Sequence, residues 1–151
     1  MRTCFLMGQH DAPDSIRERL YEELEKLVRL GGVTVMIVGH RGYFDRMATA
    51  AVQRILRKRP ELYGRVLIAY YDSTDTVPLP EFFEAHYYHI ELYEVPERYA
   101  IVKANQIALE QSDFLITYCD REGGNTGKIL RQAKRMEKKG YLKIIDLAQD
   151  G

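Results

Sequence analysis

Three short segments combine glycine with polar side chains, and each follows directly on an apolar run. They cover residues 8–11, 39–45 and 120–128. Glycine lets the backbone approach a ligand closely, and a helix that begins just after such a turn offers free N–H groups and the positive end of its dipole. Segments of this kind are typical of sites that bind an anion such as a phosphate group.

The third segment, with the sequence GGNTGK at 123–128, fits phosphate binding best, because Thr126 can donate its hydroxyl and Lys128 adds a positive charge. It is not a Walker loop, since the upstream glycine and the Ser or Thr after the lysine are missing. Gly8 opens no Gly-x-Gly-x-x-Gly fingerprint, which argues against a conventional dinucleotide-dependent oxidoreductase. The candidate ligand-binding residues in the three segments are Gly8, His10, Gly39, Arg41, Gly42, Asp45, Gly123, Gly124, Asn125, Thr126 and Gly127.

Several of these side chains could do chemistry, and each has a simpler alternative role. Asp45 could bind a ribose hydroxyl or act as a general base, or it could only complement the dipole at a helix start. His10 and His40 could contact phosphate or donate a proton, although histidines in surface loops are often incidental. Arg41 could form a two-pronged contact with phosphate or remain solvated.

The glycine segments are positioned by an alternation of strands and helices. Apolar runs predict strands at 3–7, 33–38, 66–70, 114–118 and 142–147, and most lack strict alternation, which indicates strands covered on both faces. Stripes at helical spacing start at Ile16, Phe44 and Ile101, and a last helix is expected from about Thr126; Ser15 and Glu18 form a capping-box pattern before the first. The order predicts an α/β fold with a doubly wound, mainly parallel five-stranded sheet and helices on both faces. The three glycine segments then meet at one edge of the sheet.

Residues 72–97 interrupt this alternation. The segment is rich in proline and aromatic residues, and residues 89–93 could form a short additional strand. It could cap the ligand site, form a subunit contact in a homodimer, or be a loop packed by its own aromatic side chains. No linker rich in Pro, Gly or Ser divides the chain, so residues 1–151 are expected to form a single domain.

The 22 basic and 22 acidic residues balance. Because general nucleic-acid binding rests on a basic face, this predicts no general nucleic-acid binding, although a local basic pocket for one phosphate group remains compatible with it. The cysteines and histidines lack metal-ligand spacing, so no metal site is expected and no cofactor is identified beyond a possible nucleotide ligand. No apolar stretch reaches membrane-spanning length and the N-terminus does not read as a signal peptide, so we expect a cytoplasmic protein without a membrane partner.

The order of these motifs resembles that of a known group of proteins. Gly8 and His10 follow the first predicted strand, two glycines and Asp45 follow the second, and a Gly-Gly-x-Thr turn at 123–126 follows a strand that begins after Ser-Asp. This arrangement is similar to that of the SLOG superfamily, and within it to the small YpsA-like members of the DUF1273 type. The resemblance extends over residues 3–147.

The resemblance implies a Rossmann-like fold that binds nucleotides or nucleotide-derived ligands. It also implies a ligand-contacting role for Asn105, because YpsA-like proteins carry Arg-Asn in the corresponding helix, where this chain has Ala104 in place of the arginine. The related LONELY GUY phosphoribohydrolases cleave the N-glycosidic bond of nucleoside monophosphates with a Pro-Gly-Gly-x-Gly-Thr-x-x-Glu motif. Here Ile129 and Leu130 stand where the glutamate of that motif is expected.

Three functions therefore stay open. The favoured one is a nucleotide-binding or sensing module without turnover, because aligned glycine turns occur without a convincing catalytic set. The alternative is an N-glycosidic hydrolase or transferase acting on nucleoside monophosphates, with Asp45 or Glu122 supplying the carboxylate and Asp120 as a further acid or base candidate. A weaker alternative is a protein-interaction scaffold that uses the aromatic residues at 82–93.

Overall fold

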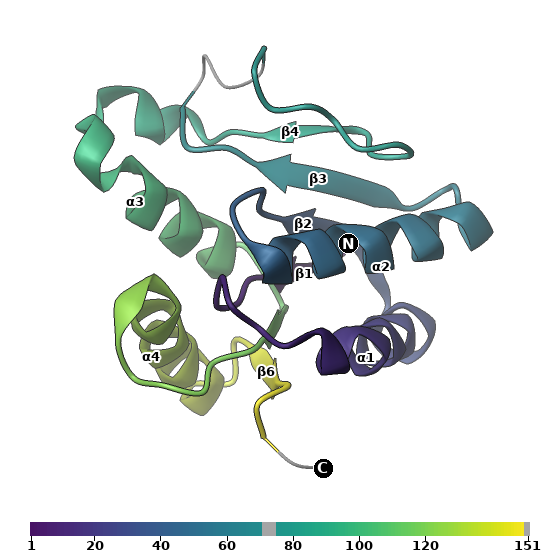
Figure 1. Cartoon of the computed structure of the whole chain (residues 1–151). Helices are drawn as coiled ribbons and strands as arrows, with labels where there is room; N and C mark the ends of the chain where they lie inside the picture. The colour runs from purple at the N-terminus through teal and green to yellow at the C-terminus, as the bar shows by residue number, and fades with distance from the viewer. Residues whose placement is uncertain (71–74, 150–151) are drawn as a thin grey trace.

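The computed structural model, which describes residues 1–70 and 75–149, is an α/β fold built on a parallel sheet (Figure 1). Within the described residues, six strands form one sheet in the order β4-β3-β2-β1-β5-β6, and every neighbouring pair is parallel. The strands are β1 (Arg2–Leu6), β2 (Val33–Val38), β3 (Tyr63–Leu67), β4 (Ala85–Tyr87), β5 (Phe114–Thr117) and β6 (Lys143–Asp146). This confirms the predicted fold class.

Helices cover the two faces of the sheet in pairs. Helices α1 (Arg17–Gly31) and α2 (Tyr43–Lys58) lie on one face, and α3 (Glu97–Glu110) and α4 (Gly124–Lys138) lie on the other. Two short 3-10 helices, η1 (Asp14–Ile16) and η3 (Ile90–Glu94), precede α1 and α3. Each face has its own buried apolar cluster, one built with α1 and α2 and one with α3 and α4.

The two clusters explain why the strands lack strict alternation. In β1, Cys4 and Leu6 pack into the cluster under α1 and α2, whereas Phe5 packs into the cluster under α3 and α4. Since both faces are apolar, every position of such a strand must be apolar, which produces a continuous run instead of a period of two. The same applies to β5, where all four residues are buried.

The strand order reverses beside β1. The chain builds outward from β1 through β2 and β3 to β4, and then returns to place β5 on the other side of β1. The loops that leave β1 and β5 therefore diverge toward opposite faces of the sheet. In open α/β sheets, the crevice at the carboxyl ends of strands at such a reversal is where ligands bind.

The structure corrects the sequence prediction in four places. The third strand, predicted at 66–70, is β3 and begins earlier, at Tyr63–Leu67. The sheet has a sixth strand, β4, which was not among the five predicted, and residues 89–93 do not form a strand, because Ile90–Glu94 is the 3-10 helix η3. Ser15 does not cap α1: the residue before the helix is Ile16, and it makes no side-chain capping bond. Residues 72–74 of the expected insertion lie outside the described residues.

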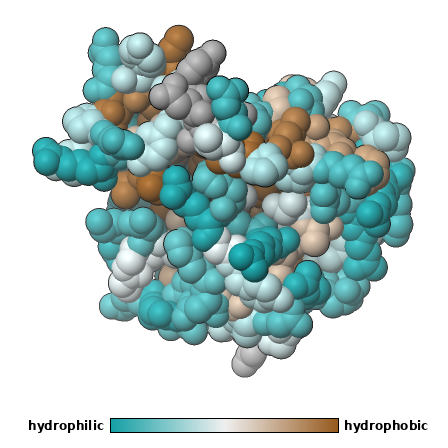
Figure 2. Space-filling model, turned by 45° about the horizontal axis from the view of Figure 1, so that its top comes forward, coloured by the Kyte–Doolittle hydropathy of each residue, from teal (hydrophilic) through white to brown (hydrophobic). Residues whose placement is uncertain are grey.

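Among the described residues, no helix combines the length and apolar character needed to span a membrane. Hydrophilic residues cover most of the face seen in Figure 2, with apolar residues gathered in its upper part. The aromatic segment is divided between these environments: Phe83 and Leu92 are buried, whereas Phe82, Ile90 and Tyr93 are exposed.

Candidate functional site

The three glycine segments converge at the carboxyl ends of β1, β2 and β5. The loop after β1 contacts the loop after β2 through a hydrogen bond from the Tyr43 N–H to the His10 carbonyl, at 3.0 Å. It contacts the loop after β5 through Gln9, whose N–H donates to the Tyr118 carbonyl at 3.1 Å. The predicted convergence of these segments on one rim is therefore present in the structure.

Three of the predicted glycines have a packing role at this convergence. A Cβ atom at Gly8 would lie 2.6 Å from the ring of Phe44, and one at Gly42 would lie 2.8 Å from the His10 Cα. At Gly39 it would lie 2.6 Å from Asp45 Oδ2. These glycines let the two loops and the start of α2 approach one another closely, so the structure gives them a reason to be glycine that involves no ligand.

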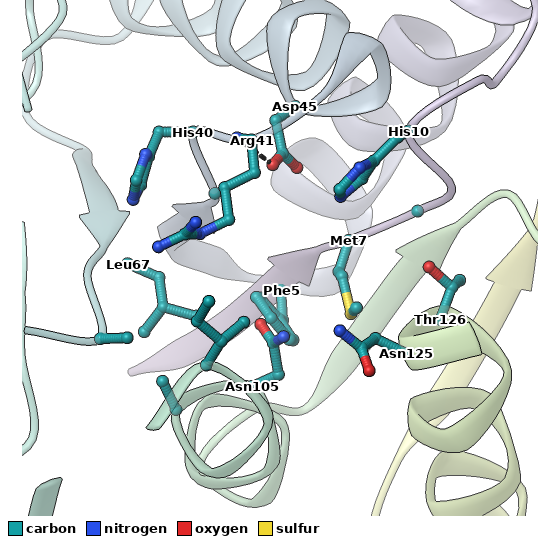
Figure 3. A pocket seen from close by; sticks show the side chains of 15 residues that line it. Phe5, Met7, His10, His40, Arg41, Asp45, Leu67, Asn105, Asn125 and Thr126 are labelled. Carbon is teal, nitrogen blue, oxygen red and sulfur yellow. Dashed lines mark hydrogen bonds between the residues drawn. The ribbon is translucent and has the colours of Figure 1, made fainter. Parts of the chain in front are cut away.

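A pocket of about 180 Å³ lies between the loops and α3. Its floor is apolar and its rim carries polar side chains, as Figure 3 shows. The floor is formed by Phe5, Met7, Leu67, Ala69, Ile101 and Ala104. The polar residues of the rim are His10, His40, Arg41, Asp45, Asn105, Asn125 and Thr126. We call this space the central pocket.

Two wider and more open pockets adjoin the central pocket. The α2 pocket, about 920 Å³, shares Gly39, His40, Arg41 and Asp45 with it. The α4 pocket, about 480 Å³, shares His10, Asn125 and Thr126 with it. Because the three pockets share these residues, they lie side by side along the carboxyl edge of the sheet, and we call them together the groove.

The Asp45 side chain extends from the first turn of α2 into the groove, between Arg41 and His10 (Figure 3). Its Oδ2 accepts a hydrogen bond from the Arg41 backbone N–H at 2.8 Å. Burial raises the pKa of the carboxyl above its ordinary value, and the Arg41 N–H and the nearby His10 and Arg41 side chains oppose this only in part. Its second oxygen accepts no hydrogen bond from any described residue and stays available to a ligand.

The other predicted polar residues of the two loops also reach the groove. His10 lines both the central pocket and the α4 pocket. Burial, assisted by the Arg41 charge, lowers the pKa of His40, which favours a neutral imidazole. The Arg41 guanidinium points into the central pocket and makes no ion pair or hydrogen bond with another described residue. Asn105, taken from the family resemblance, lines the central pocket from α3.

The start of α4 presents donors that nothing in the described chain uses. Gly123 is the N-cap and makes no side-chain cap, and the first turn contains no acidic residue. Gly124 has φ of 76°, a left-handed conformation that favours glycine. Thr126 is only 8 % exposed, yet its hydroxyl makes no hydrogen bond with a described residue. The first-turn N–H groups of α4, which have no partner within the helix, therefore face the groove with this hydroxyl.

Gly127 has a packing role beside these donors. A Cβ atom there would lie 2.2 Å from the Glu122 carbonyl oxygen, so the turn before α4 folds tightly over the helix only because this residue is glycine. Glu122 itself contributes its carbonyl, which accepts from Arg131 at 2.9 Å, while its carboxylate lines none of the three pockets. Lys128 also lies outside them.

Gln9 is a site residue that sequence reasoning missed. Its side chain is 7 % exposed and lines the α4 pocket, and its Oε1 accepts from the Asp120 N–H at 3.2 Å. This bond fixes the orientation of the amide, because the reverse orientation would place two donors together. The Nε2 atom is buried without a partner in the described chain. Its place between Gly8 and His10 was the only signal in the sequence.

An ion-paired cluster lies at the outer end of the α4 pocket, where Asp11 and Arg121 form part of the lining. Arg121 contacts Asp11 at 2.6 Å and Asp120 at 3.0 Å, which ties the loop after β1 to the loop after β5. The Arg121 guanidinium lowers the pKa of both carboxyls. Asp120 is thus an ion-pair partner in this structure. No group of three His, Cys, Asp or Glu side chains within residues 1–70 and 75–149 is arranged to hold a metal ion.

Comparison with known proteins identifies a fold relative. No family model matches the chain, and no curated protein sequence matches it significantly. Among solved structures, the chain is similar to DNA processing protein A from Helicobacter pylori, with 11 % sequence identity and a TM-score of 0.54. The alignment covers 95 % of this chain and 75 % of that one. At this identity the likeness concerns the fold alone, and membership of the SLOG superfamily stays a prediction.

The comparison overturns one prediction. The structure of the Helicobacter pylori protein is described as revealing its binding mode for single-stranded DNA. This contradicts the prediction of no general nucleic-acid binding, which rested on the balanced net charge. The physical fault is that net charge sums over the whole surface, whereas a strand of nucleic acid responds to the charges along the groove in which it lies.

Proposed function

We propose that this protein binds a nucleotide, with its phosphate at the start of α4 and its sugar and base in the central pocket. The observation that carries the proposal is the set of unused donors beside that pocket. The first-turn N–H groups of α4, the Thr126 hydroxyl and the buried Gln9 Nε2 all lack partners in the described chain. A buried donor without a partner costs free energy, and an anion that accepts from it removes the cost.

The central pocket supports the nucleoside half of the proposal. An apolar floor with a few polar groups at its rim is the usual composition of a site for a small aromatic ligand. Asp45 offers a carboxylate oxygen for ribose hydroxyls, and Asn105 offers an amide that can both donate to and accept from a base. The neutral state favoured for His40 adds a donor or acceptor without a charge.

Two further considerations support the same class of ligand. Membership of the SLOG superfamily, which we include in this proposal, implies a nucleotide or nucleotide-derived ligand at these segments. The Helicobacter pylori protein shares the fold and binds a polymer of nucleotides, which is compatible with a groove suited to nucleotide chemistry.

A pair of matched Thr→Val variants tests the phosphate site. Thr126→Val keeps the side-chain shape and removes only the hydroxyl at the start of α4. Thr34→Val removes a hydroxyl that is buried without a partner in the described chain, near the opposite end of β2 from the groove. Calorimetric titration with AMP should give an affinity lower by roughly tenfold or more for Thr126→Val, since a hydrogen bond to a charged group is lost. The affinity of Thr34→Val should equal that of the wild type.

The same titrations can contradict the proposal. If AMP, adenosine and inorganic phosphate all fail to bind at millimolar concentration and none raises the unfolding temperature, the groove is not a nucleotide site, because a ligand of the folded state must stabilise it. If both variants lose the same amount of AMP affinity, the phosphate does not bind at the start of α4.

Hydrolysis of the N-glycosidic bond is a second candidate function, favoured by the buried Asp45 carboxyl. Water would add to the anomeric carbon as the bond to the base breaks; Asp45 would accept one proton of the water and return it to the ring nitrogen of the departing base, so that the base leaves neutral and Asp45 regains its charge. Incubation with nucleoside monophosphates and chromatography for free base tests this. Release that disappears in Asp45→Asn would support turnover, and absence of release from the wild type would reject it.

A further inference from the structure

Two arginine side chains on the groove have no partner among the described residues. The guanidinium groups of Arg41 and Arg46 make no hydrogen bond, ion pair or ring contact there, whereas those of Arg17, Arg54 and Arg121 are all paired with carboxylates. Both unpaired arginines line the α2 pocket, and Arg41 also lines the central pocket. The positive charge available to a ligand is therefore concentrated at the end of the groove opposite the start of α4.

The α2 pocket has two distinct walls. One is a stripe on α2 formed by Arg46, Thr49, Ala50 and Gln53, whose spacing of three and four residues places them on one side of the helix. The other contains Pro78 and Pro80, and it is held to α2 by a hydrogen bond from Gln53 Nε2 to the Glu81 carbonyl at 3.3 Å. The pocket is thus bounded by structure on both sides and is not simply exposed helix surface.

The α2 pocket is large enough to hold a ligand group of its own, in addition to a mononucleotide in the central pocket. Its volume of about 920 Å³ lies at the upper end of the range for small-molecule sites, about 300–1,000 Å³. It adjoins the central pocket, with which it shares His40, Arg41 and Asp45. A ligand whose sugar lies beside Asp45 is therefore next to both pockets.

From these observations we propose that the α2 pocket is a second subsite, and that the ligand is two joined nucleotide units. This inference rests on the proposed function and extends it. The first unit occupies the central pocket, the anionic link between the units lies against the guanidinium groups of Arg41 and Arg46, and the second unit lies between the α2 stripe and the proline wall. Guanidinium groups suit this role because they bind phosphate oxygens through two parallel hydrogen bonds. Val66, Pro78 and Pro80 supply apolar surface for the second base or sugar.

Two kinds of molecule contain this chemistry. Each has one phosphate for the start of α4 and another between its two units. One is a free ribodinucleotide, in which a 5′-phosphorylated nucleoside is joined through a phosphodiester to a second nucleoside. The other is a pair of adjacent nucleotides in a single strand of DNA, joined in the same way. A 5′-phosphorylated adenosine dinucleotide represents the first, and a 5′-phosphorylated thymidine dinucleotide and tetranucleotide represent the second.

Affinities of AMP and of these three probes for four proteins test the proposal. The variant Arg46→Gln removes one of the two cations that line the α2 pocket, and Arg135→Gln makes the same change at an arginine in the last turn of α4 whose guanidinium has no partner among the described residues and lies away from the groove. The variant Ala50→Tyr fills the pocket from an exposed helix position. We expect Arg46→Gln and Ala50→Tyr to weaken at least one two-unit probe about tenfold and to leave AMP unchanged, while Arg135→Gln behaves as the wild type.

The outcomes separate this proposal from the one on which it rests. If AMP binds but no two-unit probe binds more tightly than AMP, or if Arg46→Gln leaves every two-unit probe unchanged, the second subsite is rejected and the nucleotide site stands. If neither AMP nor any two-unit probe binds, both fail. A loss for the adenosine dinucleotide alone assigns a free ribodinucleotide. A loss for the thymidine probes alone, with a weaker salt dependence in Arg46→Gln, assigns a single strand of DNA.

Discussion

Helices α2 and α4 both begin just after a glycine at the carboxyl edge of the sheet, and both point their N-termini at the same groove, yet the chain uses them in opposite ways. At α2, the backbone N–H of Tyr43 already donates to the His10 carbonyl, and the first turn contains Asp45. At α4, no acidic residue stands in the first turn and the first N–H groups have no partner among the described residues, although neither helix has a side-chain cap. The first N–H of α2 is thus satisfied from within the protein, and the start of α4 is left open.

Because of this difference, the two ends of the groove offer a ligand different hydrogen-bonding groups. Asp45 places a carboxylate where a helix dipole would otherwise attract an anion, so the start of α2 offers an acceptor to a ligand. The start of α4 offers only donors, supplemented by Thr126 and Gln9. A glycine before a helix is therefore not sufficient evidence for an anion site. The residue at the third position of the helix and the partners of the first N–H groups decide which chemistry the helix start provides.

The largest effect is expected from disturbing the open start of α4 at Gly127. Alanine ordinarily stabilises a helix interior relative to glycine by about 1 kcal/mol. At this position its Cβ atom would lie 2.2 Å from the Glu122 carbonyl oxygen, so the turn must shift. We expect Gly127→Ala to lower the free energy of unfolding by a net amount of about 1–2 kcal/mol, measured by urea denaturation, and to lower AMP affinity at least about tenfold.

Gly123→Ala is the matched control for this variant. A Cβ atom at Gly123 meets nothing within 4 Å and the backbone there is extended, so the free energy of unfolding should change by less than about 0.5 kcal/mol. If Gly127→Ala binds AMP as tightly as the wild type, the phosphate does not lie at the open start of α4. The difference between the starts of α2 and α4 then does not determine how the ligand binds.

The next effect concerns the satisfied start of α2. If Asp45 accepts from ribose hydroxyls, Asp45→Asn should weaken AMP binding about tenfold, because a charged acceptor is replaced by a neutral one. Inorganic phosphate, which has no sugar, should bind the variant at least as well as the wild type. Competition titrations with the two ligands measure this. A variant that binds AMP more tightly would place the phosphate beside Asp45 and exchange the roles of the two helices.

The same carboxyl makes stability depend on pH. Because burial raises its pKa in the folded protein, Asp45 contributes stability that is fully present below its ordinary value of 3.8 and is lost as the pH rises through the elevated value. The free energy of unfolding of the wild type, relative to that of Asp45→Asn, should therefore increase as the pH falls from neutral. Urea denaturation of both proteins across the acidic range measures the difference. A difference that does not vary with pH would mean that the carboxyl is well solvated.

The fold could be predicted because its signals are local. A buried parallel strand is a continuous apolar run, and a helix that covers it has apolar residues every three or four positions, so both are visible within short windows. β4 was missed because it has no such local signal. Its three residues are all half-buried, and its pairing with β3 depends on residues twenty positions away. Ser15 matched a capping pattern, but Pro13 and the turn at Asp14–Ile16 determine how the chain enters α1.

The candidate site was predictable only in part. The positions of the glycine segments followed from the topology, so their convergence could be expected. The reason for each glycine could not, because the contact of Gly8 with Phe44 joins the loop after β1 to helix α2, far apart in the sequence. Gln9 and Arg46 carry no motif and become notable only through partners that they lack in three dimensions. Sequence identifies residues that can form bonds, whereas only a structure identifies those left without one.

The smallest effect on AMP affinity is expected from the charged residues at the outer end of the α4 pocket. There, two carboxylates, Asp11 and Asp120, outnumber the single guanidinium of Arg121. The open start of α4 is thus partly shielded against anions by negative charge beside it. Replacing both carboxylates, in Asp11→Asn/Asp120→Asn, should free Arg121 and tighten AMP binding by about two- to fivefold at low ionic strength, because exposed charges interact weakly through water.

Salt dependence distinguishes this effect from a change in shape. The gain should shrink as salt is raised to about 0.5 M, where the screening length falls below the distance between exposed charges. The matched control is Glu18→Gln/Glu61→Gln, which also removes two exposed carboxylates that are paired with arginines, but outside the three pockets. If the control tightens AMP binding as much as Asp11→Asn/Asp120→Asn does, the phosphate responds to the net charge of the whole protein. The local difference between the starts of α2 and α4 would then not decide where it lies.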